Sequence, residues 1–148
     1  MGGGNFVNSR FWSNEPYLIS VGHNCQITSG VKMFTHGGAQ VLRDKLPEFD
    51  TFGKIRIGNY VYIGSNSLIM PGVTIEDNVL VAAGSVVTKS VPKGMVVGGN
   101  PAQIICTVED YLRKNEPYNL NTKSVAHGKK RELLQALDDS KFIKKGYL

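Results

Sequence analysis

Histidine is the side chain best suited to take up a proton at neutral pH, and this sequence has three of them. His36, in the run FTHGG, stands where a regular apolar pattern stops and a long polar segment begins. This position predicts that the side chain of His36 lies at a corner of the fold beside a cleft. His36 is therefore the candidate general base. His23 falls at an outward-facing position of the pattern and His127 lies beside Gly128 near the end of the chain. We expect both on the surface.

The two cysteines, Cys25 and Cys106, show neither a metal-binding spacing nor a disulfide framework. Their pattern indicates free thiols in a reducing compartment. The histidines offer no convincing set of three zinc ligands, because His23 and His36 are close in sequence while His127 lies far away in the tail. The sequence therefore predicts chemistry that needs no metal.

An apolar residue recurs at every sixth position of two long segments. The positions are Val21, Ile27, Met33, Ile57, Ile63, Ile69, Ile75, Val81 and Val87. A second set, four residues further on, is small or β-branched: Cys25, Val31, Val61, Ser67, Val73, Val79, Ser85 and Val91. Six residues turn an α-helix through about 600°, so this period cannot line one side of a helix. It fits short strands that turn a corner and repeat.

Three such strands make a triangular coil of 18 residues, and coils stack at the strand spacing of about 4.8 Å. The pattern therefore predicts an all-β parallel β-helix with two inward-facing ladders of side chains. Glycine and polar residues near the corners allow backbone angles that β-branched residues avoid. Residues 1–20 are expected to form a first, irregular coil.

The pattern breaks at residues 36–54, which predicts a loop extruded from the coil, and a loop of that length is usually functional. We expect a β-helical catalytic domain over residues 1–106 and a helical cap and tail over 107–148. A short helix is expected at 107–115, and Leu133, Leu134 and Leu137 have helical spacing in the tail.

The chain of 148 residues has a formal net charge of +5, of which residues 1–106 contribute +2. No basic stripe interleaved with aromatic residues occurs, which argues against nucleic-acid binding. No stretch reaches the roughly 20 apolar residues of a membrane span, and the first residues lack the apolar run of a signal peptide. We expect a cytoplasmic protein.

The segment Ile55–Ile105 resembles the hexapeptide-repeat acetyltransferases, through runs such as VYIGSNSLIMPGVTI and VLVAAGSVVTKSVPKGMVVGGNPA. The similarity covers about residues 13–106. Four further runs resemble the branch of this family that O-acetylates capsular polysaccharide and lipopolysaccharide: EPYLISVG, FTHGG, VLR and FGKIRIG. The resemblance implies left-handed winding, a homotrimer with active sites between neighbouring prisms, acetyl-CoA as the acetyl donor and a saccharide acceptor.

The same resemblance implies roles for single residues. His36 matches the loop histidine that deprotonates the acceptor hydroxyl, and Ser65 matches the residue whose backbone N–H stabilises the oxyanion. Ala83 lies 18 residues after Ser65 and should stack beside it, along the pantetheine arm. Gly64, Thr88 and Lys89 would line the cofactor groove, with Lys89 near phosphate.

Two residues are expected on the acceptor side. Glu15 could contact the imidazole of His36 or the acceptor, or it could be a purely structural corner residue. Asn8 is a weaker candidate. The chain also departs from its relatives. Gln103 and Cys106 replace basic residues that contact the cofactor, and Gly37 replaces an acid after the loop histidine.

The β-helix itself is compatible with other functions. An N-acetyltransferase acting on an aminosugar would use the same base, and the residues do not separate a hydroxyl acceptor from an amine. A non-catalytic assembly module would leave His36 and the loop without a purpose. A zinc carbonic anhydrase would need three converging histidines, which the sequence does not offer.

Overall fold

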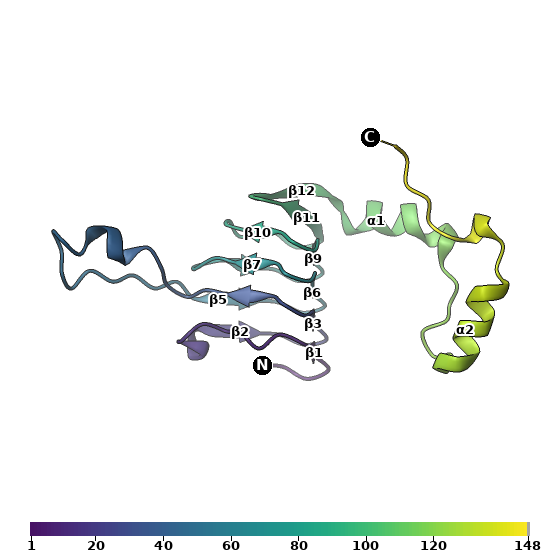
Figure 1. The fold of residues 1–148 in the computed structure, drawn as a ribbon, viewed down its shortest axis with the longest axis horizontal. Helices are drawn as coiled ribbons and strands as arrows, with labels where there is room; N and C mark the ends of the chain where they lie inside the picture. The colour runs from purple at the N-terminus through teal and green to yellow at the C-terminus, as the bar shows by residue number, and fades with distance from the viewer. Residues whose placement is uncertain (148) are drawn as a thin grey trace. The chain divides into compact units, whose positions relative to one another are not determined.

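The computed structural model describes residues 1–147, which divide into two compact units. The first unit is Met1–Val108 and the second begins at Glu109. The first unit is the β-helix that the six-residue period predicts, with three parallel sheets around one apolar core (Figure 1).

The strands are short because each one runs only from one corner of the coil to the next. One sheet holds β1 (Phe6–Val7), β3 (Gln26–Ile27), β6 (Tyr62–Ile63), β9 (Leu80–Val81), β11 (Met95–Gly99) and β12 (Ala102–Thr107). The second holds β4 (Lys32–Met33), β7 (Leu68–Ile69) and β10 (Val86–Val87). The third holds β2 (Ile19–Val21), β5 (Ile55–Ile57) and β8 (Thr74–Ile75). We call them the six-stranded, the β4–β7–β10 and the β2–β5–β8 sheet.

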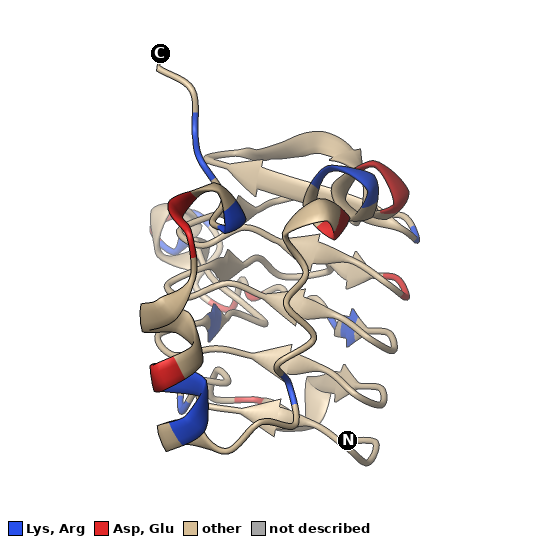
Figure 2. Ribbon diagram, turned by 90° about the vertical axis from the view of Figure 1, so that its right-hand side faces the viewer, with Lys and Arg blue, Asp and Glu red and all other residues tan. Residues whose placement is uncertain are grey.

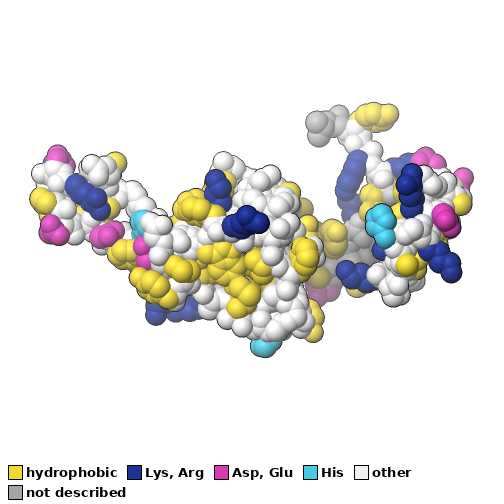
Figure 3. All heavy atoms as spheres, turned by 60° about the horizontal axis from the view of Figure 1, so that its bottom comes forward, with side chains coloured by type: hydrophobic (Ala, Val, Ile, Leu, Met, Phe, Trp, Pro, Cys, Tyr) yellow, Lys and Arg dark blue, Asp and Glu magenta, His cyan; other side chains and the backbone are white. Residues whose placement is uncertain are grey.

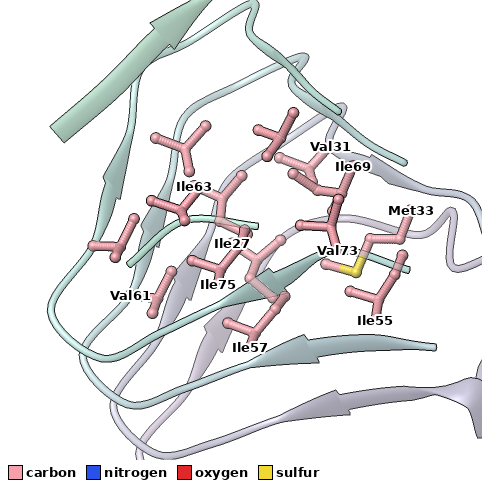
Figure 4. Packing of buried hydrophobic residues seen from close by; sticks show 14 of the residues in the cluster. Ile27, Val31, Met33, Ile55, Ile57, Val61, Ile63, Ile69, Val73 and Ile75 are labelled. Atoms are coloured by element: carbon pink, nitrogen blue, oxygen red, sulfur yellow. The ribbon is translucent and has the colours of Figure 1, made fainter. Parts of the chain in front are cut away.

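The strand register gives the length of one coil. Arg56 pairs with Thr74 and Tyr62 with Leu80, so equivalent residues are 18 positions apart. All nine apolar positions of the six-residue period are buried, and so are all eight of the second set. Figure 4 shows these side chains stacked toward one another inside the prism. Burying each large aliphatic side chain contributes about 1.5–3 kcal/mol.

The corners use left-handed backbone, as the glycines and polar residues predict. At the corner before the β4–β7–β10 sheet, Gly30, Asn66 and Gly84 stack on one another with φ values of 73°, 61° and 71°. Glycine and asparagine adopt this conformation at least cost, whereas a β-branched side chain is strained in it. The composition of these corners therefore follows from the turn that the coil must make.

Residues 1–20 form the first coil, as expected, because β1 pairs with β3 and Phe11 bridges Lys32. Val7, Trp12 and Ile19 are partly buried against the core. Figure 3 looks onto this end of the β-helical unit, where hydrophobic side chains gather.

The predicted loop is confirmed. Between β4 and β5 the chain leaves the coil, and it projects from the β-helix in Figure 1. It holds one short 3-10 helix, η2 (Ala39–Leu42), and its two ends are tied together by the bridge between His36 and Phe52.

The last strand of the β-helix is covered in a way that the six-residue period did not predict. β12 runs antiparallel to β11 and pairs along its whole length, so the outer edge of the six-stranded sheet after β9 is a hairpin. β12 therefore takes the place of β11 as the edge strand of this sheet.

The second unit is helical. It holds α1 (Val108–Asn115), which confirms the short helix expected at 107–115, the 3-10 turns η3 (Glu116–Tyr118) and η4 (Asp139–Lys141), and α2 (His127–Ala136). A helix over the leucines of the tail is confirmed for Leu133 and Leu134, whereas Leu137 is its C-cap in extended backbone. The capping role of α1 stays a prediction. Among the residues described here, no helix is long and apolar enough to cross a membrane.

The stacking of inward side chains predicts a large loss of stability when one is shortened. Ile63 is fully buried, and Ile63→Ala should lower the free energy of unfolding by about 2–5 kcal/mol in denaturant titrations, because it leaves a cavity. Val41→Ala is the control, since Val41 lies in the loop and is 79% exposed. Equal stability of the two variants would contradict the assignment of Ile63 to a packed ladder.

Candidate active site

His36 lies at the corner that follows β4, where the loop leaves the coil. The backbone N–H of Gly53 donates to the carbonyl of Thr35 at 2.7 Å, which closes the base of the loop beside the histidine. The ring of Phe52 lies 5.6 Å from the imidazole, centroid to centroid, at an angle of 57°. The side chain of His36 is 35% exposed, so it is both held and accessible to a substrate.

Glu15 comes from the first coil and lies against His36. Its Oε2 is 2.8 Å from Nδ1 of the imidazole, and its side chain is only 16% exposed. A hydrogen bond from Thr35, followed by the contact with His36, lowers the pKa of Glu15 below its ordinary value of 4.5. The carboxylate is therefore ionised at neutral pH and can only accept hydrogen bonds. In the neutral imidazole the proton then lies on Nδ1, and the lone pair is on Nε2.

Two hydroxyl groups hold the Glu15 carboxylate from the other side. Thr35, which is fully buried, donates from Oγ1 to Oε2 of Glu15 at 2.5 Å. The Ser13 hydroxyl lies 2.7 Å from Oγ1 of Thr35 and 3.3 Å from Oε2 of Glu15. Neither residue was predicted from the sequence. Only their positions in the sequence could have indicated them, because Thr35 directly precedes the histidine and Ser13 is two residues before Glu15.

Of the roles left open for Glu15, the structure shows the contact with the imidazole. Glu15 takes the orienting place that Gly37, next to the histidine, cannot fill. A role of Glu15 toward the acceptor stays a prediction. Within one chain Asn8 does not line the hollow beside His36 but a different one, with Arg10 and Phe11, and its role toward the acceptor also stays a prediction. Its backbone N–H donates to the carbonyl of Ile27, which places it at the corner before the β4–β7–β10 sheet.

A hollow opens in front of His36. Its walls come from the coil corner and from both arms of the loop: Asn14, Glu15, His36, Gly37, Gly38, Ala39, Gln40, Arg43, Asp50 and Phe52. The hollow therefore combines an accessible imidazole with polar, charged and aromatic side chains. Within residues 1–147, no three His, Cys, Asp or Glu side chains gather as a metal-binding set.

Ser65 and Ala83 stack at the corner between the six-stranded and β4–β7–β10 sheets. The backbone N–H of Gly84 donates to the carbonyl of Ser65 at 2.8 Å. Gly64 lies so close to the next coil that an added Cβ would be 2.4 Å from the backbone nitrogen of Ala83. Among residues 1–147, no hydrogen-bond acceptor is found for the backbone N–H of Ser65 or of Ala83. Two neighbouring backbone donors are thus available to an oxyanion or to an extended amide chain.

Thr88 and Lys89 lie at another corner of the coil. They follow β10 and are exposed, on the same corner of the prism as the residues after β4 and β7. Lys89 lines a hollow together with Pro92, Gln103 and Ile104. The predicted cofactor residues of one chain therefore occupy two corners, which the β4–β7–β10 sheet separates.

The other two histidines lie outside these hollows. His23 is exposed and accepts a hydrogen bond from the backbone of Gly3 at its Nδ1. His127 is exposed at the start of α2. Both are on the surface, as expected. Cys25 and Cys106 are free cysteines, and Cys25 is buried in the core.

Residues 54–89 match the family model described as "Bacterial transferase hexapeptide (six repeats)". The chain is 50% identical over 109 residues to protein CapG of Staphylococcus aureus, covering 73% of this chain and 63% of that protein. It is 37% identical over 112 residues to the galactoside O-acetyltransferase of Escherichia coli (strain K12), covering 70% of this chain and 54% of that enzyme. The chain thus spans less than two thirds of these relatives.

Among solved structures, the chain is similar to the hexapeptide-repeat acetyltransferase VCA0836 of Vibrio cholerae in its complex with acetyl-CoA. The TM-score is 0.62 at 29% identity, and the match covers 72% of this chain and 58% of that one. The predicted fold, a left-handed parallel β-helix of 18-residue coils, is confirmed.

The lowered pKa of Glu15 predicts a stability difference that depends on pH. A carboxyl whose pKa is lowered by folding stabilises the protein above its unfolded pKa, and loses this effect as pH falls through the folded value. At pH 7, Glu15→Gln should therefore unfold at lower denaturant concentration than the wild type. The gap should narrow as pH falls below about 4.5. Glu48→Gln, an exposed loop variant, is the control; a gap that stays constant down to pH 3 would contradict the role of ionised Glu15.

Proposed function

Since the chain contains a hexapeptide-repeat transferase domain, we propose that it transfers an acetyl group from acetyl-CoA to a hydroxyl group of a sugar. The acceptor would be a surface glycan or its precursor, in line with the relative named as a galactoside O-acetyltransferase. A cytoplasmic location is part of the proposal, because both cysteines are free thiols and free thiols are typical of a reducing compartment.

The observation that carries this proposal is the contact between Glu15 and His36. It holds the proton on Nδ1 and leaves Nε2 as the basic nitrogen of an accessible imidazole. In the proposed reaction Nε2 takes the proton of the acceptor hydroxyl while its oxygen attacks the thioester carbonyl. The imidazolium then returns the proton to the sulfur as the C–S bond breaks. A general base of this kind contributes about 10²–10⁴-fold in rate.

The negative charge that develops on the carbonyl oxygen needs a donor that is already in place. We assign this role to the backbone N–H of Ser65. The stacked N–H of Ala83, one coil on, is placed to bind an amide carbonyl of the pantetheine arm. Gly64 keeps the two coils in close contact, and Lys89 and Thr88 would line the path of the cofactor at the neighbouring corner.

The proposed site needs a second copy of the chain. His36 and Ser65 occupy different corners of one prism, and about four residues of extended strand, roughly 13 Å, lie between them. A groove between two neighbouring copies would bring one corner of each together. The six-stranded sheet contains no charged residue (Figure 2), and Phe6 and Tyr62 are 62% and 39% exposed on it. We therefore propose a homotrimer that buries such apolar surface, with active sites between subunits.

Replacement of His36 should strongly reduce acetyl transfer without changing the affinity for acetyl-CoA. His36→Ala should lower acetyl transfer to a panel of sugars by a hundredfold or more, because the lining of the hollow has no second imidazole to take the proton. Calorimetric titration with acetyl-CoA should give the same affinity for the variant and the wild type. Activity retained by the variant would contradict the role of His36. Failure of the wild type to bind acetyl-CoA at millimolar concentration would contradict the transferase itself.

A large side chain at the corner beside Ser65 should block the binding of acetyl-CoA. Ala83 is exposed, so Ala83→Trp places a large ring over the two backbone donors without entering the core. We expect loss of acetyl-CoA binding in calorimetry and an unchanged oligomer in sedimentation. Ser20→Trp is the matched control, because Ser20 is exposed on the polar β2–β5–β8 sheet. If Ala83→Trp binds acetyl-CoA as the wild type does, the pantetheine arm lies elsewhere.

A further inference from the structure

The hollow in front of His36 has a wall that the acetyl-transfer step does not use. It comes from the loop and includes Gln40, Arg43, Asp50 and Phe52. We propose that this wall selects an acidic sugar: the ring stacks on Phe52 and its carboxylate is bound by Arg43. This inference rests on the proposed function, since it names the class of sugar that would present its hydroxyl to His36.

Phe52 provides a stacking surface at the right place. Its ring is 53% exposed although it lies in contact with the imidazole of His36, at 5.6 Å between centroids. The backbone bridge between the two residues fixes the ring relative to the base. A flat apolar surface beside polar groups suits a pyranose, which has C–H groups on its faces and hydroxyls around its rim. A sugar stacked there has a hydroxyl within reach of the imidazole.

Arg43 provides the positive charge that would bind the carboxylate of the sugar. It follows η2 directly, and its backbone N–H donates to the carbonyl of Gln40, which continues the turn. Its side chain lines the same hollow as His36. In the described residues 1–147, Arg43 forms no ion pair, whereas Lys144 and Arg113 have acidic partners. A guanidinium with no partner that lines a hollow is suited to bind a carboxylate through two parallel hydrogen bonds.

The acidic residues of the hollow leave Arg43 available. The carboxylate of Glu15 is occupied by His36, Thr35 and Ser13. Asp50 accepts the backbone N–H of Thr51 at Oδ1 and makes no ion pair within residues 1–147. Asp50 can accept hydrogen bonds from sugar hydroxyls and would repel the carboxylate of the sugar. The opposite charges of Arg43 and Asp50 would therefore set the direction in which an acidic sugar enters.

The test compares matched sugars that differ only at C6, where a carboxylate replaces the hydroxymethyl group. Methyl glucuronoside and methyl galacturonoside are compared with methyl glucoside and methyl galactoside as acceptors for the wild-type protein, with acetyl-CoA as the donor. We expect kcat/KM to be at least about tenfold higher for the acidic member of a pair, as a charge-assisted hydrogen bond predicts. Arg43→Gln should bring that ratio to within about threefold of one, with an unchanged KM for acetyl-CoA.

Lys45→Gln is the matched control. Lys45 lies two residues further along the same loop and carries the same charge, but it does not line the hollow. It should keep the preference for acidic sugars. Transfer to neutral sugars with no preference for acidic ones would overturn this inference and leave the proposed function intact. An equal loss for both sugar classes in Arg43→Gln would also overturn it. Transfer to none of the four sugars would overturn the sugar acceptor, and this inference with it.

Discussion

The stacking of one coil on the next is the constraint on which the rest of the structure depends. Each inward aliphatic side chain packs on its equivalent one coil away, and the backbone of each coil bonds to its neighbours. Equivalent positions are therefore brought to strand spacing, however far apart they are in sequence. This places Glu15 of the first coil beside His36 of the next. The same stacking aligns the free backbone donors of Ser65 and Ala83 on a different corner.

The loop adds chemistry to this frame without disturbing it. The coil continues from β5 in the register that β4 left, because β4 pairs with β7 and β5 with β8 across the insertion. The cost of closing a long loop grows slowly with its length, so an insertion at a corner is tolerated. Its two ends are fixed by the bridge of His36 with Phe52 and by the bond from Gly53 to Thr35. The imidazole of His36 is therefore attached to backbone that is fixed at both ends of the loop, while residues such as Arg43 can differ without affecting the core.

The periodic part of the fold could be predicted from the sequence because its signal is local and repeated. Every position of the six-residue period, and of the set four residues further on, is buried, and the break in that period marks the loop. β12 could not be found in this way, because an antiparallel strand outside the coil has no fixed phase with the repeats. For the site, His36 could be located from its place at the break. Its partners Thr35 and Ser13 could not, because hydroxyl groups carry no periodic signal and their role depends on a contact across coils.

The division of the candidate residues between two corners is the reason that the proposed site needs a second copy of the chain. In one prism the imidazole of His36 lies at one corner, and the free backbone N–H groups of Ser65 and Ala83 lie at another. Placing all of them at one corner would put a charged, partly buried pair next to tightly stacked backbone, where Gly64 leaves no room for a side chain. In the proposed trimer each corner would keep the local structure that its own residues require. Apolar contact between neighbours such as Tyr62 would then both hold the copies together and exclude water from the reaction.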